Sequence, residues 1–261
     1  MARATVPPFG AIIPNALLLL DPDDSDADEE RMALERSAAP EIEASLRDQL
    51  DAVLGDGPHG NSSVATPAEL PDRIARSNGK ATDALQRMLV NGTNLGVSAV
   101  VDQLHAVGIG FNYRLANQIA ANWAKEHAFE LQKRLDVTTR ERAGAILAQW
   151  IESGENGGVG ALRDALTPWF GKFRAERVAS TEITRAFAEG SRRAYLQSGV
   201  VSEIEWLTSN DDEVCPICRP LNGRRGPLAS GIAQYGFPPA HATCRCRIAG
   251  ITSFVPGEAN G

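Results

Sequence analysis

Four cysteines and one histidine near the end of the chain are the residues whose types and spacing are best suited to chemistry. Cys215 and Cys218 form a C-x2-C pair, and after 22 intervening residues His241, Cys244 and Cys246 form an H-x2-C-x-C segment. Two thiolates separated by two residues can bind one ion from a tight turn, and Zn2+ takes four Cys or His ligands in a tetrahedron. The pattern therefore predicts a zinc site drawn from these five residues.

Five candidate ligands compete for four positions on the ion. Cys215, Cys218 and His241 are the natural choices. The fourth is Cys244 or Cys246, which project to the same side of an extended segment, and we favour Cys244 although the spacing alone leaves both open. Because a catalytic zinc keeps one position for water and here the ligands are in surplus, the predicted role of the metal is structural.

The sequence contains no recognisable catalytic motif. A zinc deaminase needs an H-x-E segment, and none of His59, His105 and His127 is followed two residues later by glutamate. The G-x-S-x-G turn of a serine nucleophile is also missing. The glycine-rich stretch 153–160 has no strand before it and no Lys-Ser/Thr after it, so it is interpreted as a loop between helices. We therefore expect a protein that is not an enzyme.

The charge distribution and apolar runs exclude several classes of protein. Residues 21–30 hold seven acidic and no basic side chains, which accounts for the whole formal charge of -7 over the 261 residues. This run is interpreted as an exposed linker, and the neutral remainder argues against a broad basic surface that wraps nucleic acid. No apolar run is long enough to span a membrane. Pro14 interrupts the apolar segment 11–20, which argues against a signal peptide and, by implying a reducing compartment, favours metal binding over disulfides.

The periodicity of apolar residues predicts a mainly α fold with a small C-terminal α+β zinc-knuckle module. Helices are expected over 41–54, 81–89, 97–104, 115–135 and 168–195, with a turn at 91–96. A further helix is expected to start at Thr138, because Thr138 and Glu141 have the spacing of a capping box. Residues 201–208 alternate with period two and predict a short strand that buries Ile204 and Trp206.

These elements divide the chain into three predicted parts. Residues 1–66 form an N-terminal arm with the acidic linker and an amphipathic helix, and residues 67–199 form a helical body. Residues 200–261 form a strand and loop module that binds zinc. The boundary is placed near Gly199, where helical periodicity ends and Gly, Pro and Cys become frequent.

Several short segments follow one another in a distinctive order along the second half of the chain. The most specific is the closing H-x2-C-R-C after Pro238 and Pro239. The others are NWAKEHAFEL at 122–131, ERVASTE at 176–182, WLT at 206–208, DEVCPIC at 212–218 and LNG at 221–223. From about Leu115 to Ile248 the chain thus resembles the phage Mu F-like head morphogenesis proteins, which are minor head proteins of tailed phages and prophages. Ala242 and Thr243 replace the Pro-Asn that is common in that family, a change that spares the ligands.

The resemblance implies a minor head protein that acts in procapsid and head morphogenesis. Its implied partners are the portal protein and the capsid or scaffold proteins, and its implied locations are the host cytoplasm during assembly and the interior of the virion head. A group of arginines makes the zinc module basic enough to contact packaged DNA through phosphates, although surface solubility explains them more simply. They are Arg219, Arg224, Arg225, Arg245 and Arg247. The alternative function is a zinc-dependent nucleic-acid-binding or nucleic-acid-processing protein of the effector or toxin type.

Overall fold

The computed structural model describes residues 18–20, 25–56, 63–209 and 214–252. Within these ranges the chain is mainly helical, with a small antiparallel sheet at one end, so the predicted fold class is confirmed. The helices are α1 (Ser25–Leu54), α2 (Leu70–Arg76), α3 (Gly79–Ala106), α4 (Tyr113–Glu152), α5 (Gly158–Phe170) and α6 (Lys172–Ser198). The strands are β1 (Leu18–Leu20), β2 (Glu203–Leu207), β3 (Arg225–Pro227) and β4 (Arg247–Thr252), and one 3-10 turn covers Arg219–Leu221.

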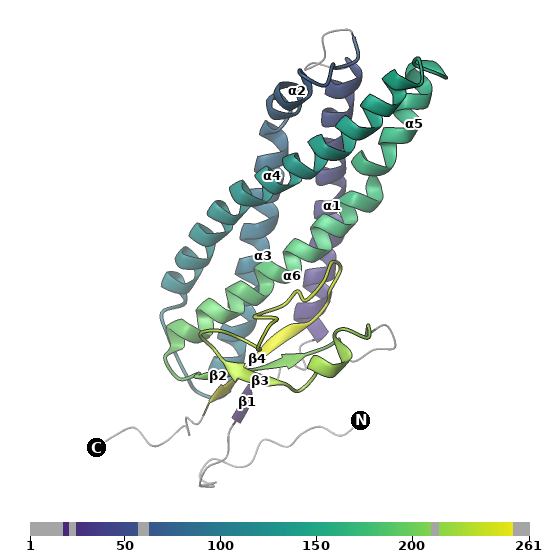
Figure 1. Ribbon diagram of the computed structural model, residues 1–261. Coiled ribbons are helices and arrows are strands. Elements are labelled where there is room, and N and C mark those ends of the chain that lie inside the picture. The colour runs from purple at the N-terminus through teal and green to yellow at the C-terminus, as the bar shows by residue number, and fades with distance from the viewer. Residues whose placement is uncertain (1–17, 21–24, 57–62, 210–213, 253–261) are drawn as a thin grey trace, which may run out of the picture.

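The long helices lie side by side in an elongated bundle, and the sheet closes one end of it (Figure 1). The strand order is β1-β4-β2-β3, with every neighbouring pair antiparallel. Ile204 and Trp206 on β2 are fully buried, as the alternating pattern predicts. None of the described helices combines the length and the apolar character needed to cross a membrane.

Two apolar cores form among the described residues. One fills the bundle between α1, α3, α4, α5 and α6, around residues such as Leu89, Leu147 and Ile183. The other joins the sheet end of α3, α4 and α6 to the C-terminal strands and includes Trp206 and Ile248. The residues predicted as a zinc module therefore share their core with the helices, because Val97, Leu104 and Tyr195 belong to the same cluster as the buried cysteines.

Helix α3 is continuous through 91–96, so the predicted turn there is wrong. The glycines in this stretch serve a helix crossing instead. A Cβ atom on Gly96 would lie 2.1 Å from the carbonyl oxygen of Phe187, and one on Gly190 would lie 2.2 Å from that of Thr93. Glycine is thus needed where the backbones of α3 and α6 approach each other, a tertiary requirement that local sequence does not distinguish from a turn.

Helix α4 is also continuous, so the predicted new helix start at Thr138 is wrong. The Thr138 and Thr139 hydroxyls donate to the carbonyl oxygens of Arg134 and Leu135, four residues earlier, at 3.1 and 2.7 Å. A threonine inside a helix commonly bonds in this way, so the same residue type fits both a cap and an interior position.

The N-terminal part of the chain differs most from its prediction. The expected exposed linker at 21–30 is helical from Ser25 onward, and Pro40 lies inside α1 rather than at its start. Residues 21–24 lie outside the described residues. Leu18–Leu20 pair with β4 of the same chain, at Leu18 with Thr252 and at Leu20 with Gly250. Similarly, Pro168 lies inside α5, and α6 begins only at Lys172.

A partly buried hydrogen bond between His127 and Glu182 connects α4 to α6. His127 Nε2 lies 2.9 Å from Glu182 Oε2, and Arg185 Nε donates to the same oxygen at 3.1 Å. The His127 ring stacks on Trp123, with centroids 4.7 Å apart. Burial acts to raise the pKa of Glu182, but the hydrogen bond with His127 and the charges of Arg185 and Arg134 outweigh it and hold that pKa below its usual value. The charged carboxylate is therefore the form that stabilises this helix contact.

We expect Glu182→Gln to lower the free energy of unfolding by about 2 kcal/mol at about pH 7, because a buried charged hydrogen-bond acceptor is lost. The pKa of Glu182 is lower in the folded chain than its ordinary value of 4.5. Its contribution is therefore complete above that value and disappears as the pH falls through the folded pKa. Urea unfolding of both proteins at about pH 7 and about pH 3 measures this difference.

Glu130→Gln provides the matched control on α4, because Glu130 pairs with Lys133 but both side chains are more than half exposed. This change should alter the free energy of unfolding by less than about 0.5 kcal/mol at either pH. An equal gap between wild type and Glu182→Gln at both pH values would contradict the assigned role of the Glu182 charge.

Candidate metal centre

The structure brings all five predicted ligands together at the sheet end of the bundle. The ligand atoms of Cys215, Cys218 and His241 lie within 4.8 Å of one another, and so do those of Cys218, Cys244 and Cys246. The two groups share Cys218. These side chains can therefore hold one metal ion next to the Cys218 sulfur, and they lie too close together for two independent sites.

The C-x2-C segment forms a tight knuckle. The backbone nitrogens of Cys218 and Arg219 donate to the carbonyl oxygen of Cys215 at 3.1 and 3.0 Å, and the chain continues into the 3-10 turn. The Cys218 nitrogen also lies 3.3 Å from Cys215 Sγ. This turn directs both sulfurs toward the H-x2-C-x-C segment, which ends where β4 begins.

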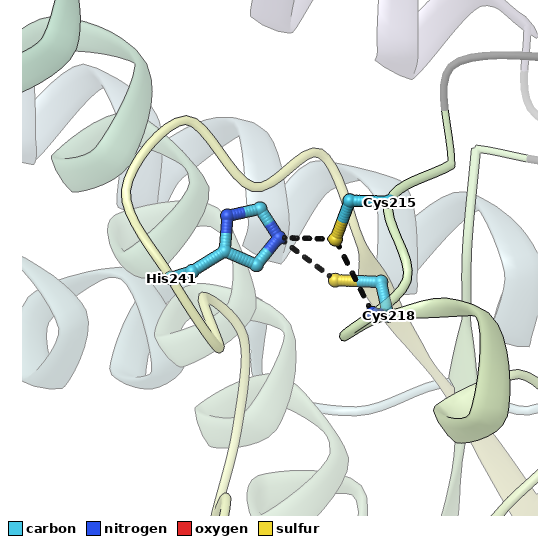
Figure 2. Close-up of side chains that lie close together, drawn as sticks. All are labelled: Cys215, Cys218 and His241. Atoms are coloured by element: carbon cyan, nitrogen blue, oxygen red, sulfur yellow. Dashed lines mark hydrogen bonds between the residues drawn. The ribbon is translucent and has the colours of Figure 1, made fainter.

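His241 points its Nε2 atom at both knuckle sulfurs, as Figure 2 shows. The distances from Nε2 to the sulfurs of Cys215 and Cys218 are both 3.0 Å. Its other ring nitrogen, Nδ1, lies 2.7 Å from the carbonyl oxygen of Ala242. Because a carbonyl only accepts, the proton of the neutral ring belongs on Nδ1, and the lone pair of Nε2 faces the sulfurs. This is the tautomer that a metal ligand requires.

Electrostatics favour a negative charge on Cys244. A hydrogen bond from the Cys246 thiol lowers the pKa of Cys244 to about 5, although burial acts to raise it. Burial, together with the charge on Cys244, raises the pKa of Cys218 to about 12. The pKa of Cys246 is raised by the same hydrogen bond to Cys244 and by burial. Bringing these buried sulfurs together therefore favours a thiolate at Cys244 and opposes a second one beside it.

The exposed side of the cluster is also suited to a cation. Burial acts to raise the pKa of Cys215, but hydrogen bonds from the backbone of Cys218 and Ile217 lower it. Burial acts to lower the pKa of His241, whereas the Ala242 carbonyl and the nearby sulfur charges raise it. A divalent ion that replaces protons here would stabilise thiolates that otherwise repel one another.

The distance between the Cys218 and Cys244 sulfurs agrees with a tetrahedral zinc site, whereas the distances from His241 Nε2 to the sulfurs of Cys215 and Cys218 are short for one. An ion with Zn–S bonds of about 2.3 Å holds its sulfurs about 3.8 Å apart. Cys218 Sγ and Cys244 Sγ are 3.7 Å apart. The nitrogen–sulfur separation in such a site is about 3.5 Å. The 3.0 Å distances from His241 Nε2 to the sulfurs of Cys215 and Cys218 are therefore shorter than in a metal-bound site. The donor set of thiols and imidazole fits zinc.

Helix α6 holds the loop that carries three of the candidate ligands. The Thr184 hydroxyl donates to the carbonyl oxygen of Cys244 at 2.7 Å, and the backbone nitrogen of Thr243 donates to the Thr181 hydroxyl at 2.9 Å. The two threonines are three residues apart and so lie on one face of α6. Neither contact is predictable from the sequence, because each joins residues about 60 positions apart.

Several arginines that make this region basic already have partners. Arg225 pairs with Glu205 at 2.9 Å, and Arg247 pairs with Asp28 at 2.7 Å. Arg219 donates to the carbonyl oxygen of Val214 at 3.3 Å. These contacts give the arginines structural roles and weaken the argument from charge for DNA binding.

Comparison with known proteins gives one match. A family model described as phage Mu protein F like protein matches residues 116–249, just over half of the chain, and the matched range contains all five candidate ligands. Neither the curated proteins nor the solved structures gave a match.

Proposed function

The chain belongs to the phage Mu F-like family, and we propose that it is a minor head protein that acts in procapsid and head morphogenesis with one structural zinc ion. The observation that carries the proposal is the position of the Cys/His cluster inside the matched range. Its partners in this proposal are the portal protein and the capsid or scaffold proteins. Its place is the host cytoplasm during assembly and then the interior of the head.

The zinc ligands in this proposal are Cys215, Cys218, His241 and Cys244. The 3.7 Å distance between the Cys218 and Cys244 sulfurs supports the choice of Cys244. Cys246 is then an outer partner, whose sulfur lies within 4.8 Å of the sulfurs of Cys218 and Cys244. Such outer partners orient ligands and tune the ion.

The shape of the molecule supports a docking role. The four long helices, α1, α3, α4 and α6, have 27 to 40 residues and are about 40 to 60 Å long at about 1.5 Å per residue. Phe173 on α6 is 81% exposed and Phe129 on α4 is 57% exposed. Large aromatic side chains on the outer faces of helices are typical anchors for contacts between proteins.

Deletion of the coding sequence from the phage or prophage that carries it tests the assembly role. Electron microscopy of lysates is expected to show aberrant or empty heads, and the wild-type chain supplied from a plasmid should restore filled heads. The supplied protein should also sediment with purified procapsids. A deletion mutant that makes normal infectious particles, or protein that stays in the soluble fraction, would contradict this function.

The fourth ligand can be identified with two serine variants. Native mass spectrometry of the wild-type chain should show one zinc ion, which a strong chelator removes. Cys244→Ser should weaken zinc binding by more than about a hundredfold, whereas Cys246→Ser should weaken it less, by about ten- to a hundredfold, the effect of losing an outer partner. The opposite order would make Cys246 the ligand. Wild-type protein with no bound metal would remove zinc from the proposal.

A further inference from the structure

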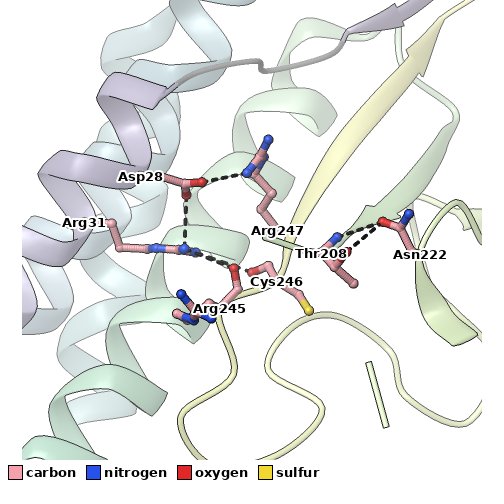
Figure 3. Close-up of polar contacts among 7 residues, drawn as sticks. All are labelled: Asp28, Arg31, Thr208, Asn222, Arg245, Cys246 and Arg247. Atoms are coloured by element: carbon pink, nitrogen blue, oxygen red, sulfur yellow. Dashed lines mark hydrogen bonds and ion pairs between the residues drawn. The ribbon is translucent and has the colours of Figure 1, made fainter. Parts of the chain in front are cut away.

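Arg31, on the first turns of α1, directly contacts the loop 241–246, which carries the candidate ligands His241, Cys244 and Cys246. It lies 215 residues before Cys246, yet its guanidinium nitrogens donate to the carbonyl oxygens of Arg245 at 3.0 Å and of Cys246 at 3.5 Å. Its side chain is 2% exposed. Figure 3 shows the guanidinium of Arg31 directed from α1 toward these two carbonyls. Helix α1 thus forms hydrogen bonds with the same loop that α6 contacts through Thr181 and Thr184.

A second contact from α1 lies one turn before Arg31. Asp28 pairs with Arg31 at 3.0 Å and with Arg247 at 2.7 Å, so one carboxylate joins the helix to the residue that follows Cys246 (Figure 3). The Phe187 ring of α6 lies 5.6 Å from the Arg31 guanidinium carbon and supplies an aromatic face. A buried arginine with a carboxylate, two carbonyls and a ring around it is held in one orientation.

This orientation restricts the backbone from which the cysteine side chains leave. The carbonyl of Arg245 lies between Cys244 and Cys246, and the carbonyl of Cys246 directly precedes β4. The Arg31 contacts restrain the backbone at Arg245 and Cys246, and the Thr184 hydroxyl restrains the carbonyl of Cys244. Metal affinity is sensitive to such support because a ligand that must be ordered on binding costs conformational entropy.

We propose that Arg31 is a positioning residue of the metal centre, so that zinc binding and the docking of the start of α1 are coupled. The proposal rests on the zinc site proposed above. Helix α1 lies outside residues 116–249, so the family match assigns it no part in that site. By reciprocity, whatever α1 adds to zinc affinity, zinc adds to the docking of α1 and of the neighbouring β1–β4 pairing.

A matched control exists at the far end of the bundle. Arg73 on α2 is 1% exposed and donates to the carbonyl oxygens of Ala52 at 3.3 Å and Ser63 at 2.6 Å. It also pairs with Glu69 at 2.9 Å. Arg73 therefore has the same burial and the same kinds of partner as Arg31 but lies far from the ligands. Loss of either arginine should destabilise the fold, and only loss of Arg31 should affect the metal.

The test compares Arg31→Met, Arg31→Lys and Arg73→Met in the full chain. Zinc affinity is measured by competition with a chromophoric chelator, and thermal unfolding is recorded alongside. Arg31→Met should bind zinc about ten- to a hundredfold more weakly than wild type. Arg31→Lys should recover part of the affinity because it keeps the charge. Arg73→Met should unfold at a lower temperature and bind zinc as tightly as wild type.

Hydrogen exchange of the wild-type chain tests the reverse direction without any variant. Removal of zinc should speed amide exchange at residues 27–34 of α1 and leave residues 70–76 of α2 unchanged. Suppose that the wild-type chain binds zinc. If Arg31→Met then has wild-type zinc affinity, or if amide exchange at 27–34 is the same with and without zinc, the coupling is overturned and the zinc site stands. If the wild-type chain binds no zinc, the site and the coupling are both overturned.

Discussion

Replacing Cys218 by serine is expected to weaken zinc binding by about two orders of magnitude and to loosen the fold around residues 214–252. Cys218 belongs to both ligand groups, is 3% exposed, and has its sulfur 3.0 Å from His241 and 3.7 Å from Cys244. A structural zinc site contributes about 10 to 16 kcal/mol of apparent binding free energy. A quarter of that, for one ligand in four, is about 2.5 to 4 kcal/mol, which weakens binding by about seventyfold to about eight-hundredfold.

The measurement is zinc stoichiometry by native mass spectrometry together with thermal unfolding. Ile217→Ser is the control, because Ile217 lies within the same knuckle but is 47% exposed and offers no ligand atom. It should retain one zinc ion and unfold close to wild type. A Cys218→Ser protein that retains zinc against a competing chelator as well as wild type does would show that the cluster does not depend on the residue at its centre.

Replacing Gly96 by alanine is expected to cost at least about 3 kcal/mol of unfolding free energy, at the upper end of overpacking effects. The added methyl would lie 2.1 Å from the Phe187 carbonyl oxygen, and relief requires that α3 and α6 move apart as backbones. Gly190→Ala meets the same obstacle from the other helix, 2.2 Å from the Thr93 carbonyl oxygen. Either change should also disturb both apolar cores, since α3 and α6 contribute to each.

Gly160→Ala reverses the sign of this effect and so serves as its control. Gly160 lies inside α5 with no atom within 4 Å of an added Cβ. Alanine there should stabilise the chain by up to about 1 kcal/mol, because glycine is the poorer helix former. Urea unfolding midpoints of Gly96→Ala, Gly190→Ala and Gly160→Ala, each compared with wild type, measure these changes in stability. A Gly96→Ala variant that loses less than about 1 kcal/mol would mean that the helix crossing is looser than the structure indicates.

The sequence predicted what depends on short-range pattern. The alternation around Ile204 and Trp206 gave a strand with the correct buried face, because a strand with one buried face alternates with period two. The spacing of the Cys and His residues gave a cluster that the structure assembles, because a C-x2-C knuckle is defined by its own few residues. In both cases the information lies within a handful of neighbouring positions.

The features that the sequence did not predict depend on contacts between distant segments. Gly92 and Gly96 resemble a turn until α6 is placed against them, and Thr138 resembles a cap until α4 is seen to continue. Arg31 follows a run of acids that suggests solvent exposure, yet it is buried against a loop more than 200 residues away. No local rule assigns a partner at that separation, so these roles required the three-dimensional arrangement.

The pairing of β1 with β4 has a mechanical consequence. The first described residue of β1, Leu18, lies opposite the last described residue of β4, Thr252, and the ladder ends at Leu20 and Gly250. A pulling force applied at Leu18 and Thr252 therefore acts at the same end of an antiparallel ladder and opens its hydrogen bonds one after another. Under tension the short β1–β4 pairing would separate first, and the helical bundle and the cysteine cluster would carry little of the force.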